Sequence, residues 1–287
     1  MTTWIRRAHS VATQKVEEFT GEGAYHGSTR QKAPNAPRPQ VDAVSEAMPL
    51  TLERYEERGA TMIASFDACF PNDLRLVEQL EVPSQESVRD DGVTFCWCPF
   101  EDAVEIAGPV TRGVLNGMRA GLTGGKRHIY IDSKIQYFEA GDLPVDSSLW
   151  HVDGSIAVRD HRVTRFGATV LHDMRARFEH GDPPKYMAYQ SSDHCATSFL
   201  DQPLRLRMPE LIPNFNDFDA AVRIAGISEV AHPAGAILGY DGLTLHLATH
   251  ATSSGWRLWI RCTETDVEIH PSASIIECYG TVFRPRR

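Results

Sequence analysis

From residue 128 onward, the chain alternates between short apolar segments and short polar breaks. The segments are rich in β-branched and aromatic residues, and Gly, Pro and Asp lie between them. That pattern is typical of consecutive strands joined by turns, and it predicts a sandwich or barrel of short strands. The clearest segments are HIYIDSKIQYF (128–138), LWHVDGSIAV (149–158), RFGATVLHDM (165–174), KYMAYQSS (185–192), AILGYDGLTLHLATHAT (236–252) and GWRLWIRCTETDVEIH (255–270).

The preceding part of the chain has mostly helical periodicity. Apolar residues recur at helical spacing in LTLERYEERGATMIASF (50–66) and in EDAVEIAGPVTRGVLNGMRAGL (101–122), which Pro109 interrupts. Between them, VTFCWCPF (93–100) is a strand candidate. A further helical segment at 208–226 reads as an insertion before the last strands.

The first residues have a different composition. Residues 21–49 are rich in Gly, Pro, Ser and Ala, which disfavours regular structure. We therefore expect a flexible arm over residues 1–45 and a single domain over 46–287. Within that domain, we expect a helical support at 46–125 and a β-rich core at 126–268, so that the fold class is α+β, mainly β.

Composition narrows the class of protein. With 287 residues, 42% of them hydrophobic, the chain can bury a sizeable core. Its formal net charge of −9 argues against binding to duplex nucleic acid. It has no apolar run of about 18 residues, so we expect no membrane contact. The N-terminal segment lacks the apolar stretch of a secretory signal, and we expect a cytoplasmic protein with reduced cysteines.

The segment 149–158 contains the first candidate for chemistry. His151 and Asp153 are two residues apart, and residues i and i+2 of a strand share a face. Two histidines and one carboxylate can hold Fe(II) and leave three coordination positions open. An Asp-Gly pair is also a common turn, so Asp153 could simply shape a hairpin. The motif recurs at His180 and Asp182, in a Gly/Pro-rich stretch that reads as an exposed loop.

A second histidine must then come from a distant strand. His246 stands on an apolar stretch, and Arg257 follows it eleven residues later. An arginine that points into a sheet core is costly unless an anion meets it, which a dicarboxylate would do. His250 and Arg261 have the same spacing and form an alternative pair. Gly235 and Asp241 precede His246, and a family resemblance favours the first pair on that ground.

These residues resemble the motif of the Fe(II)/2-oxoglutarate-dependent oxygenases. The resemblance covers roughly residues 129–265 and rests on His151-Val152-Asp153, His246 and Arg257 in GWRLWIR. It implies a double-stranded β-helix core of the jelly-roll, cupin-like type at 126–268, with the helical segment as its scaffold. It also implies that His151, Asp153 and His246 ligate Fe(II). Arg257 would bind the far carboxylate of the co-substrate 2-oxoglutarate, and O2 would be the oxidant.

Two further residues are candidates for binding the co-substrate. Gln136 lies on the strand segment before the motif, and Thr169 lies on the segment after it. The resemblance implies a hydroxylase or desaturase acting on a small molecule, an amino acid or a peptidyl substrate. Two other functions stay open: a cupin-like metal dioxygenase that does not use 2-oxoglutarate, and an inactive barrel that acts as a binding protein.

Overall fold

Two long strands form the centre of the fold. In this computed structural model, β4 (His128–Phe138) and β11 (Gly255–Thr265) pair antiparallel along their whole length. The structure describes residues 65–145, 148–153, 183–209 and 215–268, which all belong to one unit of the chain. Both strands coincide with segments that the sequence predicts, because β-branched and aromatic residues dominate each of them.

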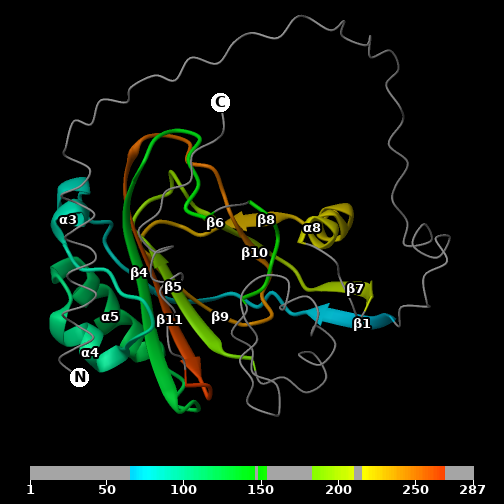
Figure 1. The fold of residues 1–287 in the computed structure, drawn as a ribbon, viewed down its shortest axis with the longest axis horizontal. Coiled ribbons are helices and arrows are strands. Elements are labelled where there is room, and N and C mark those ends of the chain that lie inside the picture. Colours follow the sequence, from blue (N-terminus) through cyan, green and yellow to red (C-terminus); the bar gives the residue numbers. More distant parts are fainter. Residues whose placement is uncertain (1–64, 146–147, 154–182, 210–214, 269–287) are drawn as a thin grey trace, which may run out of the picture. The chain divides into compact units, whose positions relative to one another are not determined.

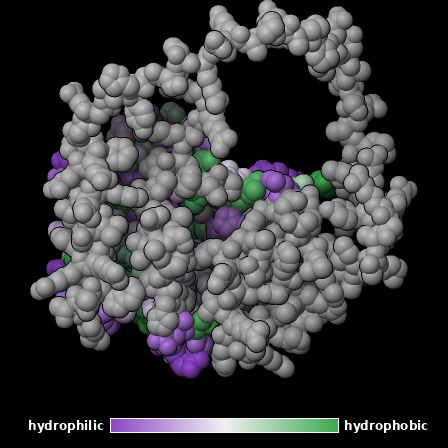
Figure 2. Space-filling view, viewed as in Figure 1, coloured by the Kyte–Doolittle hydropathy of each residue, from purple (hydrophilic) through white to green (hydrophobic). Residues whose placement is uncertain are grey.

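β4 and β11 belong to a six-stranded antiparallel sheet with four other strands. The order in the sheet is β2-β9-β5-β11-β4-β3, and each neighbouring pair is antiparallel. The other members are β2 (Arg75–Gln79), β3 (Cys98–Pro99), β5 (Lys185–Gln190) and β9 (Ala236–Asp241). At the end where β4 begins and β11 ends, Lys126 and Arg127 pair with Asp266, and Figure 2 shows hydrophilic side chains there.

Three helices lie against one face of this sheet: α3 (Gln85–Asp90), α4 (Phe100–Ile106) and α5 (Pro109–Gly121) (Figure 1). Pro109 is the first residue of α5, where its missing N–H costs nothing. The Asp91 carboxylate accepts hydrogen bonds from the free backbone N–H groups of Val110 and Thr111. The predicted interruption at Pro109 is therefore a boundary between two helices.

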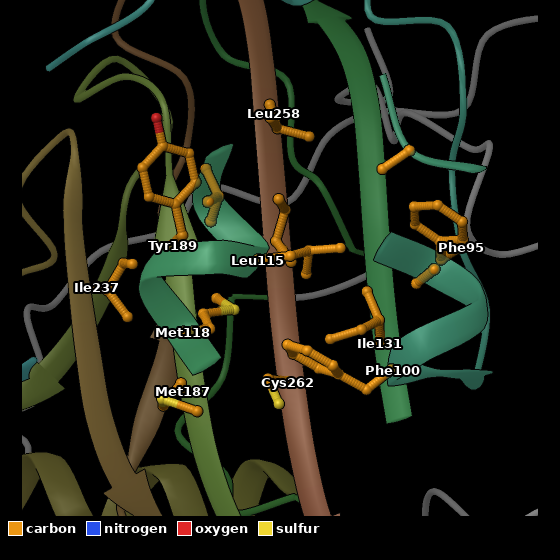
Figure 3. Packing of buried hydrophobic residues seen from close by; sticks show 14 of the residues in the cluster. Phe95, Phe100, Leu115, Met118, Ile131, Met187, Tyr189, Ile237, Leu258 and Cys262 are labelled. Atoms are coloured by element: carbon orange, nitrogen blue, oxygen red, sulfur yellow. The ribbon is translucent and has the colours of Figure 1, made fainter. Parts of the chain in front are cut away.

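The hydrophobic core lies between these helices and the sheet. Leu115 and Met118 of α5 pack with Met187, Ile237 and other residues of the sheet face (Figure 3). On β11 the same face carries Leu258, Ile260 and Cys262, all fully buried. Because side chains alternate along a strand, Arg257, Trp259 and Arg261 must point to the opposite face of the sheet.

Two smaller sheets and one further helix make up the rest of the described fold. A three-stranded antiparallel sheet has the order β10-β6-β8, and β1 pairs with β7. The bounds are β1 (Ser65–Phe70), β6 (Thr197–Leu200), β7 (Leu204–Pro209), β8 (Glu229–Ala231), β10 (His246–Ala248) and α8 (Phe215–Ile224). A second hydrophobic cluster joins Trp150 and Val152 to Leu245, Leu247 and Phe218. This cluster buries both neighbours of His151 in the chain.

The architecture is therefore α+β with mainly antiparallel sheets. The sheets do not close into a barrel within the described residues. In the same part of the chain, no helix is long and apolar enough to cross a membrane.

The expected helical support at 46–125 needs a correction, because β1 and β2 also lie in it. The helical pattern predicted for 50–66 ends in a strand: Phe66, Ala68 and Phe70 are buried at every second position, which is the strand period. β2 is mostly exposed at the edge of the sheet, so no apolar alternation marks it. The predicted strand 93–100 is reduced to the two residues of β3.

Candidate functional site

His151 and His246 are joined through their backbones. The N–H of each residue donates to the carbonyl of the other, and both N···O distances are 3.0 Å. This isolated antiparallel bridge extends β10 to the segment that contains the His-x-Asp motif. Directly opposed residues in an antiparallel pair have their side chains on the same face. As a result, the two imidazole ring centroids are only 4.4 Å apart.

The tautomer of each imidazole follows from its hydrogen bond. Nδ1 of His151 lies 2.8 Å from the Leu149 carbonyl oxygen, and Nδ1 of His246 lies 3.0 Å from that of Thr244. A carbonyl oxygen can only accept, so each Nδ1 carries the proton and donates it. In a neutral ring, Nε2 then keeps its lone pair. Histidines that bind metals are oriented by this kind of hydrogen bond.

Asp153 brings the third candidate ligand to the same place. Its Oδ2 is buried, has no hydrogen-bond partner among the described residues, and lies 3.8 Å from Nε2 of His246. Its Oδ1 accepts a 2.8 Å hydrogen bond from Nη1 of Arg261. A buried carboxylate oxygen without a partner is costly, and a cation at this position would remove the cost.

The electrostatics favour the protonation states that a metal needs. Burial and the adjacent His151 ring lower the pKa of His246 from 6.5 to about 4, despite the opposing effect of Asp153. Burial alone would raise the pKa of Asp153, but Arg261 and the imidazoles of His246 and His151 hold it below its ordinary value. At neutral pH, His246 is therefore uncharged and Asp153 is an anion, which are the forms of these side chains that bind metals.

The three side chains do not yet surround a common point. Among the described residues, no group of three or more His, Cys, Asp or Glu side chains is arranged so that it could hold a metal ion as it stands. Two ligand atoms at right angles on a metal, each at about 2.1 Å, are about 3 Å apart. The 3.8 Å between Asp153 Oδ2 and His246 Nε2 exceeds that by less than 1 Å. Two imidazoles and one carboxylate are side-chain types that suit a divalent metal, but these side chains would have to rotate before a metal could bind.

Arg257 is a buried cation of a different kind. Its side chain is on the same face of β11 as Arg261, and its residue is 3% exposed. Nη2 donates to Oε1 of Gln190 at 3.2 Å, whereas Nε has no hydrogen-bond partner. No carboxylate among the described residues pairs with it, and burial lowers the pKa of its guanidinium. Such a group is a natural receptor for an anion.

Other polar atoms near Arg257 also lack partners. The Gln190 side chain connects Arg257 to two nearby residues. It accepts from Arg257, and its Nε2 donates to the carbonyl oxygens of Ser192 and His232. Oγ of Ser192, Nε2 of His194 and Nδ1 of His232 are all buried without a hydrogen bond. The charge of Arg257 reaches both histidines and lowers their pKa values, although burial is the larger cause. These atoms are available to hydrogen-bond water or a polar ligand.

The two alternative histidine–arginine pairs, His246 with Arg257 and His250 with Arg261, have different surroundings in the structure. His246 lies beside His151 and Asp153, whereas His250 is exposed and its Nδ1 donates to the carbonyl of Gly141. Arg261 is paired with two carboxylates and Arg257 with none in the described part of the chain.

The two remaining candidates have different positions. Gln136 is buried and lies directly opposite Arg257 in the β4–β11 register, so the two residues are cross-strand neighbours. Thr169 lies outside the described residues, as does the second His-x-Asp pair, His180 and Asp182.

Sequence reasoning missed two residues of this region. Asp132 pairs with Arg261, and Gln190 with Arg257. Asp132 could have been found from the sequence, since it is the one carboxylate in the strand segment HIYIDSKIQYF. Gln190 had none, because a glutamine at the end of a strand is usually exposed.

Comparison with known proteins adds nothing to these observations. No family model, no curated protein and no solved structure gives a significant match to the chain.

Proposed function

We propose that the chain is an Fe(II)- and 2-oxoglutarate-dependent oxygenase that hydroxylates an unactivated C–H bond. The observation that carries the proposal is the convergence of His151, Asp153 and His246. Both histidines keep an Nε2 lone pair, and Asp153 keeps a buried oxygen without a partner. Two imidazoles and one carboxylate suit ferrous iron and leave coordination positions for other ligands.

The metal site in this proposal has three ligands: Nε2 of His151, Nε2 of His246 and Oδ2 of Asp153. Bound iron would supply the activation of O2 that the protein side chains cannot provide. The residues supply binding and orientation: the Leu149 and Thr244 carbonyls fix the two rings, and Arg261 fixes the carboxylate.

The co-substrate in this proposal is held by Arg257. A dicarboxylate that enters the sheet needs a cation for its far end, and a guanidinium can bind a carboxylate through two parallel hydrogen bonds. Arg257 is buried and free of carboxylates in the described residues, so it has donors available. Gln136, opposite Arg257, is placed to assist as a hydrogen-bonding neighbour.

The proposed fold of the core is a double-stranded β-helix. A six-stranded antiparallel sheet with helices on its outer face and a smaller three-stranded sheet are compatible with it. In this arrangement, β10 supplies His246 and β11 supplies Arg257, and the site lies on the face of the large sheet opposite the helices. Substrates of the proposed enzyme are small molecules, amino acids or peptidyl side chains.

The test is conversion of 2-oxoglutarate. The chain is incubated with Fe(II), O2, 2-oxoglutarate and a panel of amino acids, peptides and small acids, and succinate is measured. We expect Fe(II)-dependent succinate formation in wild type and none in Asp153→Ala. If an organic substrate is oxygenated without 2-oxoglutarate, the protein is a cupin-like dioxygenase instead. If neither reaction occurs and no metal binds, the alternative of an inactive barrel that acts as a binding protein is favoured.

A further inference from the structure

Arg261 joins the candidate metal ligand Asp153 to a second buried carboxylate. Its Nη1 donates to Oδ1 of Asp153 at 2.8 Å, and its Nη2 donates to Oδ2 of Asp132 at 3.0 Å. The side chains of Arg261 and Asp132 are 7% and 0% exposed, so water does not screen the pair. The three groups form a buried row of alternating charge that ends at the proposed metal.

The position of Arg261 is fixed from several directions. Asp132 lies directly opposite Arg261 in the β4–β11 register, and its Oδ1 accepts a 2.8 Å hydrogen bond from the backbone N–H of Trp97. Cζ of Arg261 also lies 5.3–5.6 Å from the ring centroids of Trp97, Tyr186 and Trp259. Aromatic faces attract a guanidinium and restrict its orientation. Arg261 is thus a rigid donor, with its position set by the large sheet.

We propose that Arg261, anchored by Asp132, is a positioning residue that makes Asp153 bind the metal through Oδ2 alone. This inference rests on the proposed metal site. Oδ1 is committed to Arg261, whereas Oδ2 has no partner and is the oxygen nearest to His246 Nε2. Binding through both oxygens would break the hydrogen bond and leave a buried guanidinium half-paired.

The consequence concerns the number of open coordination positions. An octahedral metal with three single-atom protein ligands keeps three positions, enough for a chelating keto acid and O2. A carboxylate that binds through both oxygens would take one of these positions. Arg261 therefore protects the position that the third external ligand needs.

The same contacts argue against Arg261 as the receptor for the co-substrate. Its guanidinium already meets two carboxylates, so the three groups carry a net negative charge that a further anion would increase. Arg257, four residues earlier on the same face, has no such carboxylate in the described residues. The two arginines of β11 thus have separate tasks.

The experiment measures binding of Co(II) to the full-length chain by titration calorimetry and by its visible absorption, which depends on coordination number. We compare wild type with Arg261→Met, Arg261→Lys and Asp132→Asn. The matched control is Arg119→Met, because Arg119 also pairs with a carboxylate, that of Glu101, but lies on α5, on the opposite side of the large sheet from the proposed site. Circular dichroism checks that each variant is folded. We expect a 1:1 site in wild type and in Arg119→Met, with the same spectrum.

Loss of a hydrogen-bonding partner of a metal ligand costs about 10- to 100-fold in affinity. We expect that loss in Arg261→Met, together with a changed Co(II) spectrum. Arg261→Lys should recover part of the affinity, because an ammonium can still reach one carboxylate. Asp132→Asn should weaken binding less than Arg261→Met. If Arg261→Met does not fold, Arg261→Lys and Asp132→Asn decide the question by the same two readouts.

Two results would overturn the inference in distinguishable ways. Folded Arg261 and Asp132 variants with the affinity and spectrum of wild type would show that Arg261 does not position Asp153, while the metal site stands. A wild-type chain that binds no Co(II) would remove the metal site itself and the inference with it.

Discussion

The backbones of His151 and His246 exchange two hydrogen bonds of 3.0 Å, which holds their imidazole centroids 4.4 Å apart. One histidine is in a segment after β4 and the other is in β10, almost a hundred residues later. The bridge therefore builds a local site from distant parts of the chain. Its neighbours Trp150, Val152, Leu245 and Leu247 are buried in one hydrophobic cluster, which stabilises the pairing.

The first prediction concerns the histidines. His151→Ala and His246→Ala each remove a proposed ligand, so Fe(II) affinity should fall by more than the roughly 10- to 100-fold that loss of an outer partner costs. His250→Ala should bind Fe(II) like wild type, since His250 is exposed and bonds to the Gly141 carbonyl. Anaerobic Fe(II) titration with a colorimetric chelator measures all three. Loss of binding in His250→Ala alone would favour the alternative pair.

The second prediction contrasts the two buried arginines of β11 in the ligand-free protein. Arg257 has no carboxylate among the described residues, so Arg257→Met should stabilise the fold by about 1–3 kcal/mol. Arg261→Met leaves Asp132 and Asp153 buried without their cation and should destabilise it by about 3–5 kcal/mol. Urea unfolding gives both free energies. Saturating 2-oxoglutarate with a divalent metal should stabilise wild type more than Arg257→Met.

The two variants should change the free energy of unfolding in opposite directions. If Arg257→Met is as destabilised as Arg261→Met, then Arg257 has an internal counter-ion, and the argument for an anion receptor is wrong.

The third prediction concerns the pH dependence of stability. His232 is 1% exposed, and burial together with Arg257 lowers its pKa from 6.5 to about 4. Between these two values the unfolded chain binds more protons than the folded one. Stability is therefore complete above about pH 6.5 and is lost as the pH falls to about 4. For a shift of this size, the loss from His232 is about 3 kcal/mol.

The matched variants are His232→Phe and His250→Asn. We expect His232→Phe to lose about 3 kcal/mol less than wild type between pH 7 and pH 4. His250 is exposed, so His250→Asn should follow the wild-type profile. Urea unfolding at several pH values measures the slopes. Equal slopes for wild type and His232→Phe would mean that His232 takes up its proton in the folded state.

Much of the β-rich half could be predicted from the sequence, because strong local patterns determine it. β4 and β11 are long runs of β-branched and aromatic residues, and α4 and α5 meet at Pro109 as expected. The alternation along β11 also predicted that Arg257 and Arg261 share a face. The first strands could not be predicted, since β2 is an exposed edge strand with no apolar signal of its own.

The three residues of the candidate site could be singled out from the sequence, whereas their surroundings could be predicted less well. His151, Asp153 and His246 stand out because histidines and a carboxylate flank apolar strand residues. The partnership of Arg261 with Asp132 depends on the register of β4 against β11, which the sequence does not specify. The contact of Gln190 with Arg257 likewise depends on β5 lying beside β11.

The most direct test of the central claim is an anaerobic titration of the metal-free chain with Fe(II) and then with 2-oxoglutarate, followed by visible absorption. A keto acid chelated to ferrous iron gives a weak metal-to-ligand charge-transfer band. We predict this band in wild type and His250→Ala, its loss in His246→Ala and its weakening in Arg257→Ala. Iron that binds to the wild-type chain without producing the band on addition of 2-oxoglutarate would contradict the account.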